Sequence, residues 1–461
     1  MASAWLARQF TSGNQKTFTI SCWVKRGSLG TRPIVSYAAT VGSGGSGARG
    51  NLSFDNDLLY FQFNPTGSSW WSYYVNTRLF RDTHGWYHIV IRVDTTDGSA
   101  SNRLKIYVNG EQQTLNSSIG TQDLDTGWNA NNLYHHIGRY ASSTSVTSTN
   151  TWDGGMAHFH YVDGTAYDAS TFGETDATTG IWKPKTSPSV TYGTNGFFLK
   201  FDNSANMGLD SGGSNNLTTN GTIIQDKDTP SNVFATINPL NSYFAGGSFS
   251  IGNTKIEPSS SAHGAWNTGT LGFSSGKYYW EVKVSGSNNG DECQVGIADK
   301  SPNGNSGSST AGTSFGYNSN GEYGIYAWNG AFIGNAVANP YTSYGSSCSN
   351  GIIMIAVDLD NSKFYGGCNG TWFGSGDPAN GTNGKTIQAV ADTVDGFYYP
   401  AISTYQGYTG TAEFNFGNGY FGTTAVSSAQ NPDDGIGIFE YDVPAGYRAL
   451  CTKSINAEEY S

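Results

Sequence analysis

The stretch KTFTISCWVKRG, Lys16–Gly27, alternates apolar side chains with small polar ones. Successive side chains of an extended chain point to opposite faces, so Phe18, Ile20 and Cys22 share one face while hydroxyl-bearing residues occupy the other. This period of two predicts a β-strand that buries its apolar face. The stretch GWYHIVIRVD, residues 85–94, reads as a further strand.

A hairpin signal lies further along, in NRLKIYVNGEQQTL, residues 102–115, where Asn109-Gly110 separates two strand-like runs. Strand-like runs recur in both halves of the chain, and no segment shows a sustained helical period. The composition agrees, because 62 glycines, 28 tyrosines and only 13% charged residues suit strands joined by tight turns. We predict an all-β protein of two antiparallel β-sandwiches, of jelly-roll or concanavalin type.

The formal net charge of −11 argues against nucleic acid as a partner, because phosphate binding needs clustered Lys and Arg. No apolar run is long enough to span a bilayer, so we expect no membrane insertion. The amino terminus, MASAWLARQF, lacks a charged segment followed by an apolar one, so we expect no secretory signal. We expect no cofactor.

The five cysteines are widely spaced and lack a CxxC pair. We predict that they are reduced, buried side chains rather than a disulfide framework or a zinc site. They are Cys22, Cys293, Cys348, Cys368 and Cys451. The composition resembles that of an extracellular adhesin, whereas no export signal is expected. A virion protein that is assembled in the host cytoplasm and released by lysis reconciles the two observations.

The chain is expected to divide at a polar stretch that ends in DKDTPSNVFATINPL, residues 226–240, where two prolines stiffen the crossing. We predict one sandwich over 1–225 and a second over 241–424. From about Ala425 the strand pattern stops, and the segment 425–461 retains many apolar residues. We expect this segment to pack against a sandwich, a neighbouring subunit or a virion protein and to contribute to assembly.

The second sandwich resembles the SPRY domain family over most of 265–422. The resemblance rests on six motifs in the order of the family: GKYYWEV (276–282), QVGIAD (294–299), GYNSNGEYGIY (316–326), IAVDLDNSKFY (355–365), FYYPAIS (397–403) and EFNFG (413–417). This resemblance implies a β-sandwich that binds protein or peptide partners through loops at one end and has no enzymatic activity.

The first sandwich resembles the laminin G-like or concanavalin-like family. The motifs are FTISCWVKRG (18–27), FRDTHGWYHIVIRVDTT (80–96), NRLKIYVNG (102–110), HHIGRY (135–140) and FGETDATTGIWKPK (172–185). The pairing of the two modules is similar to structural proteins of tailed bacteriophages, particularly marine ones. It implies an exposed virion part, such as a tail fibre or tailspike, that recognises a glycan or protein of the host surface.

Two alternatives stay open beside host recognition. The chain could be a head decoration or a tail spacer without a dedicated ligand, or an enzyme that degrades polysaccharide. The hypothesis of a polysaccharide-degrading enzyme is disfavoured. Concanavalin-like glycosidases place their catalytic carboxylates at an E-x-D-x-x-E spacing, and neither candidate in this chain completes it. Glu174 and Asp176 are followed by Thr179, and Glu440 and Asp442 lack the third carboxylate as well. We therefore expect no enzymatic activity.

His158 and His160 are spaced as a metal pair on one strand face would be. No cysteine or carboxylate follows at a recognisable metal-ligand spacing, so we favour histidines that are satisfied by hydrogen bonds. Asp153, Asp163 and Asp168 could supply calcium ligands in a laminin G-like sandwich, but their spacing is not ordered. We predict no metal site.

Aromatic residues are the better candidates for binding. Trp328 in YAWNG, and Trp372 and Phe373 in NGTWFG, lie in turns rich in Gly and Asn. Their rings could pack against a sugar or a peptide side chain, with a polar partner for each indole N–H. For any single turn aromatic, covering the end of the sandwich core is the commoner role.

The stretch GSSWWSYYVNT, Gly67–Thr77, places aromatics on both faces of a strand. We predict that Trp71 and Tyr73 belong to the core. Trp70 and Tyr74 then meet a subunit, the neighbouring domain or a ligand. A symmetric homo-oligomer, together with contacts to other virion proteins, would cover this surface most simply.

Overall fold

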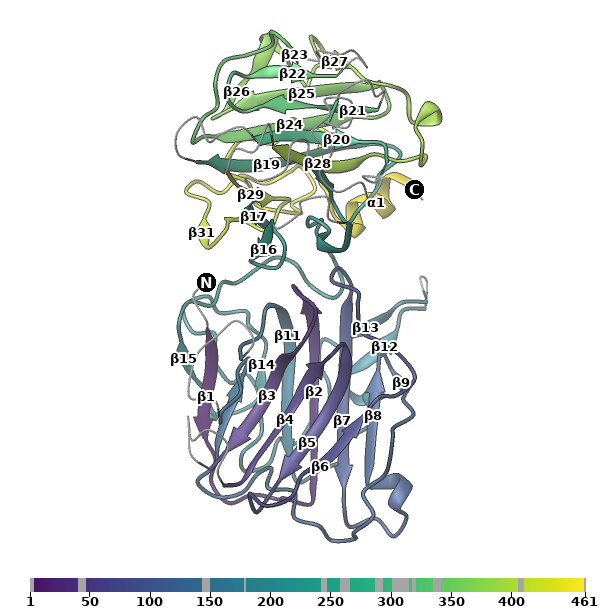
Figure 1. The fold of residues 1–461 in the computed structure, drawn as a ribbon, viewed down its shortest axis with the longest axis vertical. Helices are drawn as coiled ribbons and strands as arrows, with labels where there is room; N and C mark the ends of the chain where they lie inside the picture. Colours follow the sequence, from purple (N-terminus) through teal and green to yellow (C-terminus); the bar gives the residue numbers. More distant parts are fainter. Residues whose placement is uncertain are drawn as a thin grey trace. The chain divides into compact units, whose positions relative to one another are not determined.

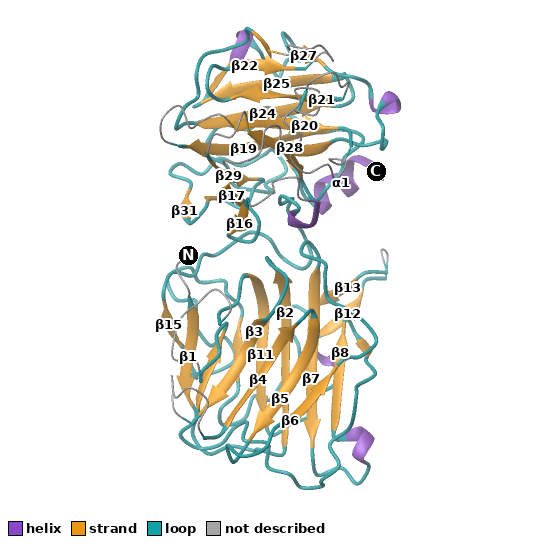
Figure 2. Ribbon diagram, in the orientation of Figure 1, coloured by secondary structure: helices purple, strands orange, loops and turns teal. Residues whose placement is uncertain are grey.

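A computed structural model of the chain describes residues 4–39, 47–142, 150–177, 180–241, 247–257, 266–286, 293–300, 315–316, 321–334, 341–404 and 410–459. The chain forms two compact units, Met1–Gln225 and Asp226–Ser461. Figure 2 shows that strands dominate both units. The predicted all-β class is confirmed. No helix in the described part of the chain is long and apolar enough to cross a membrane.

The first unit is a sandwich of two antiparallel sheets (Figure 1). One sheet has the order β15 (Thr218–Asn220), β1 (Trp5–Gln9), β10 (Tyr134–Ile137), β3 (Arg32–Ala38), β4 (Arg49–Asp55), β5 (Leu58–Asn64) and β6 (Trp71–Tyr74). The other has the order β14 (Phe197–Leu199), β11 (Gly154–Asp163), β2 (Thr17–Arg26), β7 (Trp86–Asp94), β8 (Leu104–Val108) and β9 (Glu111–Gln112). Short 3₁₀ turns lie at Ala100–Asn102 and Ala169–Thr171.

Strand β2 is central to its sheet and pairs with β7 and β11. Phe18, Ile20 and Cys22 face the main core, as predicted. The predicted hairpin at Asn109-Gly110 is also confirmed, because it joins β8 to β9 with φ angles of 50° and 83°. These positive values are the ones that a type I′ turn requires.

The polar face of β2 is buried too, which the alternation did not predict. A small second core covers this side of the sheet. It joins Val90 of β7 and Val162 of β11 to Phe172 and Trp182 in the chain that follows. Trp182 lies on the hairpin of β12 (Gly173–Thr175) and β13 (Trp182–Pro184), and its Nε1 donates to His88 Nδ1 at 2.9 Å.

The second unit is also built of two sheets. The larger has the order β16 (Ser248–Ser250), β17 (Lys255–Glu257), β29 (Thr411–Asn415), β19 (Lys277–Ser285), β24 (Ile352–Asp358), β25 (Lys363–Cys368) and β26 (Thr371–Trp372), with β27 (Lys385–Thr386) beside β25 and β32 (Arg448–Ala449) beside β19. The smaller has the order β18 (Trp266–Thr268), β28 (Tyr399–Thr404), β20 (Cys293–Ala298), β21 (Glu322–Tyr326), β22 (Ala331–Ile333) and β23 (Tyr341–Thr342).

The remaining elements of this unit are short. They are the pair β30 (Tyr420–Phe421) and β31 (Thr424–Ala425), 3₁₀ turns at Pro239–Asn241, Phe373–Ser375 and Val390–Asp392, and the helix α1 (Thr452–Glu459). Apolar side chains of both sheets form one buried core, which includes Trp280, Ile297 and Ile355.

Residues 425–461, called the C-terminal segment below, belong to the second unit. Phe439, Tyr447 and Leu450 are at most 1% exposed and lie in its core. Strand β32 adds to the large sheet in parallel with β19. Ala235 N donates to Leu450 O at 3.0 Å, so the C-terminal segment also pairs with the chain that enters the unit. The segment therefore closes the core of this unit.

One buried carboxylate holds the C-terminal segment against β19. Glu281 Oε1 accepts the backbone N–H of Tyr441 at 2.8 Å, and Oε2 accepts that of Glu440 at 2.9 Å. The hydroxyl of Tyr279 and the amide of Asn415 donate to the same carboxylate at 2.9 and 3.2 Å. Burial raises the pKa of Glu281 to about 7, and these donors oppose the rise.

We expect Glu281→Gln to lower the free energy of unfolding of the second unit. In either orientation the amide N–H₂ would face one backbone N–H and one side-chain donor and leave buried groups unpaired, which costs about 1–3 kcal/mol. Urea unfolding of the full chain, followed by tryptophan fluorescence, measures the change. Glu413→Gln on β29 is the control, because Glu413 is only half-buried. Equal stability of the two variants would show that the four hydrogen bonds to Glu281 contribute nothing.

The cysteine prediction was wrong for one pair. Cys348 and Cys368 form a disulfide across 20 residues, with their Cα atoms 5.7 Å apart. The loop before β24 and the end of β25 bring the two together through long-range pairing that sequence spacing does not reveal. Cys22, Cys293 and Cys451 are free and buried, as predicted.

Candidate functional site

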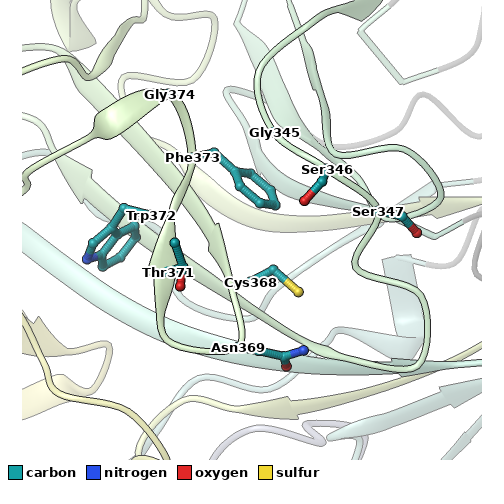
Figure 3. A pocket seen from close by; sticks show the side chains of 9 residues that line it. All are labelled: Gly345, Ser346, Ser347, Cys368, Asn369, Thr371, Trp372, Phe373 and Gly374. Carbon is teal, nitrogen blue, oxygen red and sulfur yellow. The ribbon is translucent and has the colours of Figure 1, made fainter.

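A hollow of about 570 Å³ opens in the second unit between two loops (Figure 3). One wall is the loop 345–347, and the other is the hairpin of β25 and β26 with the turn after it. The lining residues are Gly345, Ser346, Ser347, Cys368, Asn369, Thr371, Trp372, Phe373 and Gly374. Two of them, Trp372 and Phe373, are residues that the sequence predicted as candidates for binding. We call this hollow the 368–374 pocket.

The hairpin wall is built on a two-residue turn, Asn369-Gly370, with φ angles of 46° and 83°. These values fit a type I′ turn, for which Asn-Gly is the preferred sequence. Asn369 Oδ1 accepts the backbone N–H of Ile352 at 2.8 Å, and Asn369 N donates to Ile352 O at 2.9 Å. The first of these bonds fixes the orientation of the amide, because only its oxygen can accept.

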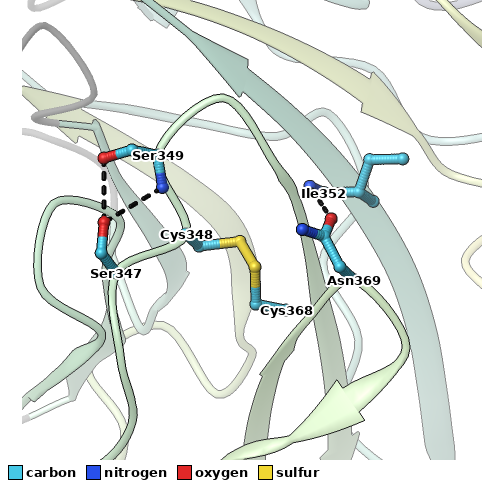
Figure 4. Close-up of a disulfide and its surroundings, with 6 residues drawn as sticks. All are labelled: Ser347, Cys348, Ser349, Ile352, Cys368 and Asn369. Atoms are coloured by element: carbon cyan, nitrogen blue, oxygen red, sulfur yellow. Dashed lines mark hydrogen bonds between the residues drawn. A yellow bond between two sulfur atoms is a disulfide. The ribbon is translucent and has the colours of Figure 1, made fainter.

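The other wall is held by the disulfide and by its own hydrogen bonds (Figure 4). Cys348, at the end of this loop, is bonded to Cys368 of the hairpin, so the two walls are covalently joined. Ser347 Oγ donates to Ser349 Oγ at 2.9 Å and accepts the N–H of Ser349 at 3.3 Å. The pocket is therefore preorganised on both sides.

Trp372 and Phe373 have different roles in the pocket. In Figure 3 the ring of Phe373 points toward Ser346, whereas the indole of Trp372 points away from it. Phe373 is 6% exposed and packs edge-to-face against Tyr344, with centroids 5.9 Å apart. Trp372 is half-buried and lies edge-to-face on Tyr279 at 6.3 Å. Phe373 thus provides the apolar floor and Trp372 an outer wall.

Trp328 lies on the neighbouring turn between β21 and β22 and does not line the pocket. Its side chain is 44% exposed and contacts Tyr326, with ring centroids 5.9 Å apart. The turn is tied to the pocket loop, since Cys348 N donates to Ala327 O at 2.8 Å. Trp328 is therefore an exposed aromatic beside the pocket.

The aromatic strand β6 lies in the first unit, and its faces divide as predicted. Tyr73 is 2% exposed in the core, and Trp71 packs against the same core. Trp70 precedes the strand, is 45% exposed, and has the guanidinium of Arg49 over its ring at 5.0 Å. Tyr74 is half-buried beside Tyr60, with centroids 5.0 Å apart.

The edge of this sheet is capped by a side chain. Tyr74 N donates to Asn116 Oδ1 at 2.8 Å, and Asn116 N donates to Tyr74 O at 3.1 Å. Asn116 thereby occupies the backbone groups that an added strand would need. A partner at this surface would contact the aromatic side chains rather than extend the sheet.

We expect the double variant Trp70→Ser, Tyr74→Ser to keep its secondary structure and to weaken contact with a subunit or another partner. The reason is that neither ring lies in the buried core. Circular dichroism and sedimentation velocity measure the two effects, with the exposed Ile181→Ser as the control. A loss of stability of about 3–5 kcal/mol, typical of a deleted core aromatic, would show that both faces are core.

Three of the four carboxylates considered for catalysis interact with neighbouring protein groups. Asp176 Oδ2 lies 2.8 Å from Lys183 Nζ, and Glu174 lies 3.9 Å from the same ammonium. Glu440 accepts the N–H of Ser427 at 2.6 Å, while Asp442 is exposed. Thr179 lies outside the described residues.

The candidate metal ligands are also bonded to protein groups. Asp163 accepts the N–H of Asn14 at 2.8 Å, and Asp168 accepts the hydroxyl of Tyr107 at 2.8 Å. His160 Nδ1 bonds to the hydroxyl of Tyr192 at 2.8 Å. His158 lies against the same ring, Phe198, as His160 does. Among the residues with described positions, no group of three His, Cys, Asp or Glu could hold a metal ion.

The sequence missed the polar residues of the pocket. Asn369 had a signal, because Asn-Gly between strand-like runs marks a hairpin. Ser346, Ser347 and Thr371 had none, since they resemble the other hydroxyl residues of the loops. The disulfide that joins the walls was also missed.

Comparison with known proteins supports the resemblance of the first unit. Residues 5–165 match the sequence profile of the concanavalin A-like lectin/glucanases superfamily. No curated protein sequence matches the chain.

Solved structures that are similar to this chain include SPRY domains. Stonustoxin is 17% identical over 39% of this chain and 27% of that chain, with a TM-score of 0.28. The SPRY domain of human HERC1 is 15% identical over 39% of this chain and 96% of that chain, with a TM-score of 0.28. The native heptameric SAP-like pentraxin from Limulus polyphemus is 16% identical over 43% of this chain and 88% of that chain, with a TM-score of 0.29. The chain therefore spans about a quarter of the stonustoxin chain. These low TM-scores carry no argument about function. The sequence match and the two stacked sheets agree that residues 5–165 lie in a concanavalin-like β-sandwich.

Proposed function

We propose that this chain is a structural protein of a tailed bacteriophage that is exposed on the particle, as a tail fibre or tailspike is, and that binds a glycan or protein of the host surface without enzymatic activity. The observation that carries the binding role is the 368–374 pocket. Aromatic, hydroxyl and amide side chains meet there on a preorganised frame. Such a combination of apolar surface and a few placed polar groups is typical of ligand sites.

Three further observations support the proposal. The lectin-type superfamily match of residues 5–165 is consistent with recognition of carbohydrate. Trp70 and Trp328 are each more than two-fifths exposed, at 45% and 44%, and offer further contact surface. The disulfide of Cys348 and Cys368 suits a protein that works outside the reducing cytoplasm after lysis.

Two measurements test the proposal. Antibodies raised against the purified chain should label intact phage particles in electron micrographs, and the fluorescently labelled chain should bind cells of the host strain more than cells of unrelated strains. A head decoration or tail spacer would label particles without preferring any strain. Failure of the antibodies to label particles would overturn the virion role, and equal binding to all strains would overturn the recognition role.

A further inference from the structure

Among the residues that the structure describes, those that line the 368–374 pocket carry no ionisable group. The nine lining residues are neutral, and Cys368 has no titrating thiol because it is bonded to Cys348. A charged ligand group would meet no counter-charge among these lining side chains. The composition of the lining therefore selects for an uncharged ligand.

The polar atoms at the rim are of two kinds. The side chains of Ser346 and Thr371 are exposed, and their hydroxyls can both donate and accept. Asn369 presents a donor to a ligand. Its Oδ1 already accepts the N–H of Ile352, so the N–H groups of its Nδ2 are the ones that a ligand can bind. The hydroxyls of a sugar also both donate and accept, so they are chemically complementary to each of these three side chains.

The floor of the pocket is apolar. The ring of Phe373 lies between the hairpin and Ser346, and the disulfide sulfur of Cys368 borders it (Figure 3). A sugar ring has C–H groups on its faces and hydroxyls around its edge, so an apolar border beside polar side chains suits it. The hollow, of about 570 Å³, is open to solvent, so a ligand would contact it from one side.

The C-terminal segment runs behind the hairpin. A Cβ atom at Gly370 would lie 3.1 Å from the ring of Tyr441, so the C-terminal segment passes directly along the turn. Glu440 and Asp442 flank Tyr441 in the chain. The carboxylates of Glu440 and Asp442 are not among the lining residues of the pocket.

We propose that the 368–374 pocket binds one uncharged sugar unit of a host-surface glycan. Phe373 and the disulfide form the apolar border of the site, while Asn369, Thr371 and Ser346 bind the hydroxyls of the sugar. This inference rests on the proposed function and narrows it, since it names the class of ligand and the residues that recognise it.

The test uses two variants that keep the frame intact. Asn369→Asp removes the donor and adds a charge, yet it retains an oxygen for the N–H of Ile352 and tolerates the φ of 46°. Thr371→Val removes an exposed hydroxyl at constant shape. Asn350→Asp is the matched control, because Asn350 is exposed, has a φ of 53°, and accepts the N–H of Gly286 at 3.3 Å, but does not line the pocket.

The probes are the methyl glycosides of glucose, galactose, mannose and N-acetylglucosamine, with glucuronic and sialic acid glycosides as charged counterparts. Saturation-transfer NMR with the full chain measures the dissociation constants. We expect at least one neutral glycoside to bind and the charged ones not to bind. Asn369→Asp should weaken binding by about tenfold or more, Thr371→Val should weaken it measurably, and Asn350→Asp should leave it unchanged.

The inference fails if no neutral glycoside binds, if a charged glycoside binds as tightly as the neutral ones, or if Asn369→Asp behaves like the Asn350→Asp control. Cell binding separates this failure from failure of the proposed function. If the native chain and the Asn369→Asp variant bind host cells equally well, only the assignment of the pocket is overturned. If the native chain binds no strain more than the others, the host-recognition role is overturned, regardless of which glycosides bind.

Discussion

Truncation of the chain after Thr424 is expected to unfold the second unit and to leave the first unit folded. The deletion removes Phe439, Tyr447 and Leu450 from the core, where each is at most 1% exposed. Loss of a core aromatic costs about 3–5 kcal/mol, so the sum exceeds the stability of many domains, which is about 5–15 kcal/mol. It also leaves the buried carboxylate of Glu281 without two backbone donors.

Thermal unfolding followed by circular dichroism measures this result. The full chain should show two transitions, and the truncated chain should lose the one that belongs to the second unit. A chain that lacks only Tyr460 and Ser461 serves as the control for length. Two unchanged transitions in the truncated chain would show that the C-terminal segment is dispensable for folding. In that case the role in assembly that the sequence suggested would become the better explanation.

Acidification is expected to unfold the first unit before the second. Burial lowers the pKa of His88 and His135 to about 3 and that of His136 to about 4. In the unfolded chain each imidazole titrates near its ordinary value of about 6.5. Below that pH the unfolded state binds protons that the folded state excludes, so the free energy of unfolding falls as the pH falls.

Each of these histidines therefore lowers the free energy of unfolding of the first unit between a pH of about 6.5 and its own folded pKa, and the losses add as the pH falls. Six of the 7 histidines lie in the first unit, so the effect should be confined to it. Differential scanning calorimetry between pH 7 and 4 measures it. A first-unit transition that stays at the same temperature while the second-unit transition falls would contradict the assignment.

The local features of the fold were predictable from the sequence. The alternation around Phe18 gave the core face of β2, and Asn109-Gly110 gave a hairpin, because strand periodicity and turn chemistry are encoded by neighbouring residues. The same period of two predicted that Trp71 and Tyr73 face the core and that Trp70 faces away from it.

Features that depend on distant pairing were not predictable. Thr19 and Ser21 look solvent-facing in the sequence, but they are buried on the side of the sheet that the second core around Phe172 covers. Cys348 and Cys368 meet only because the loop before β24 lies beside the end of β25. The candidate site was predictable in part. Trp372 and Phe373 were found as turn aromatics, whereas the hydroxyl residues opposite them become a site only when the two walls are joined.

The most direct test of the account is to measure binding and hydrolysis in the same sample. Purified surface polysaccharide from the host strain is incubated with the native chain, and bound protein and free reducing ends are both followed over time. We expect that the native chain binds the polysaccharide, that the Asn369→Asp variant binds it more weakly, and that reducing ends do not increase. Reducing ends that accumulate with time in the presence of the native chain would contradict the account, because they would show that the chain is an enzyme.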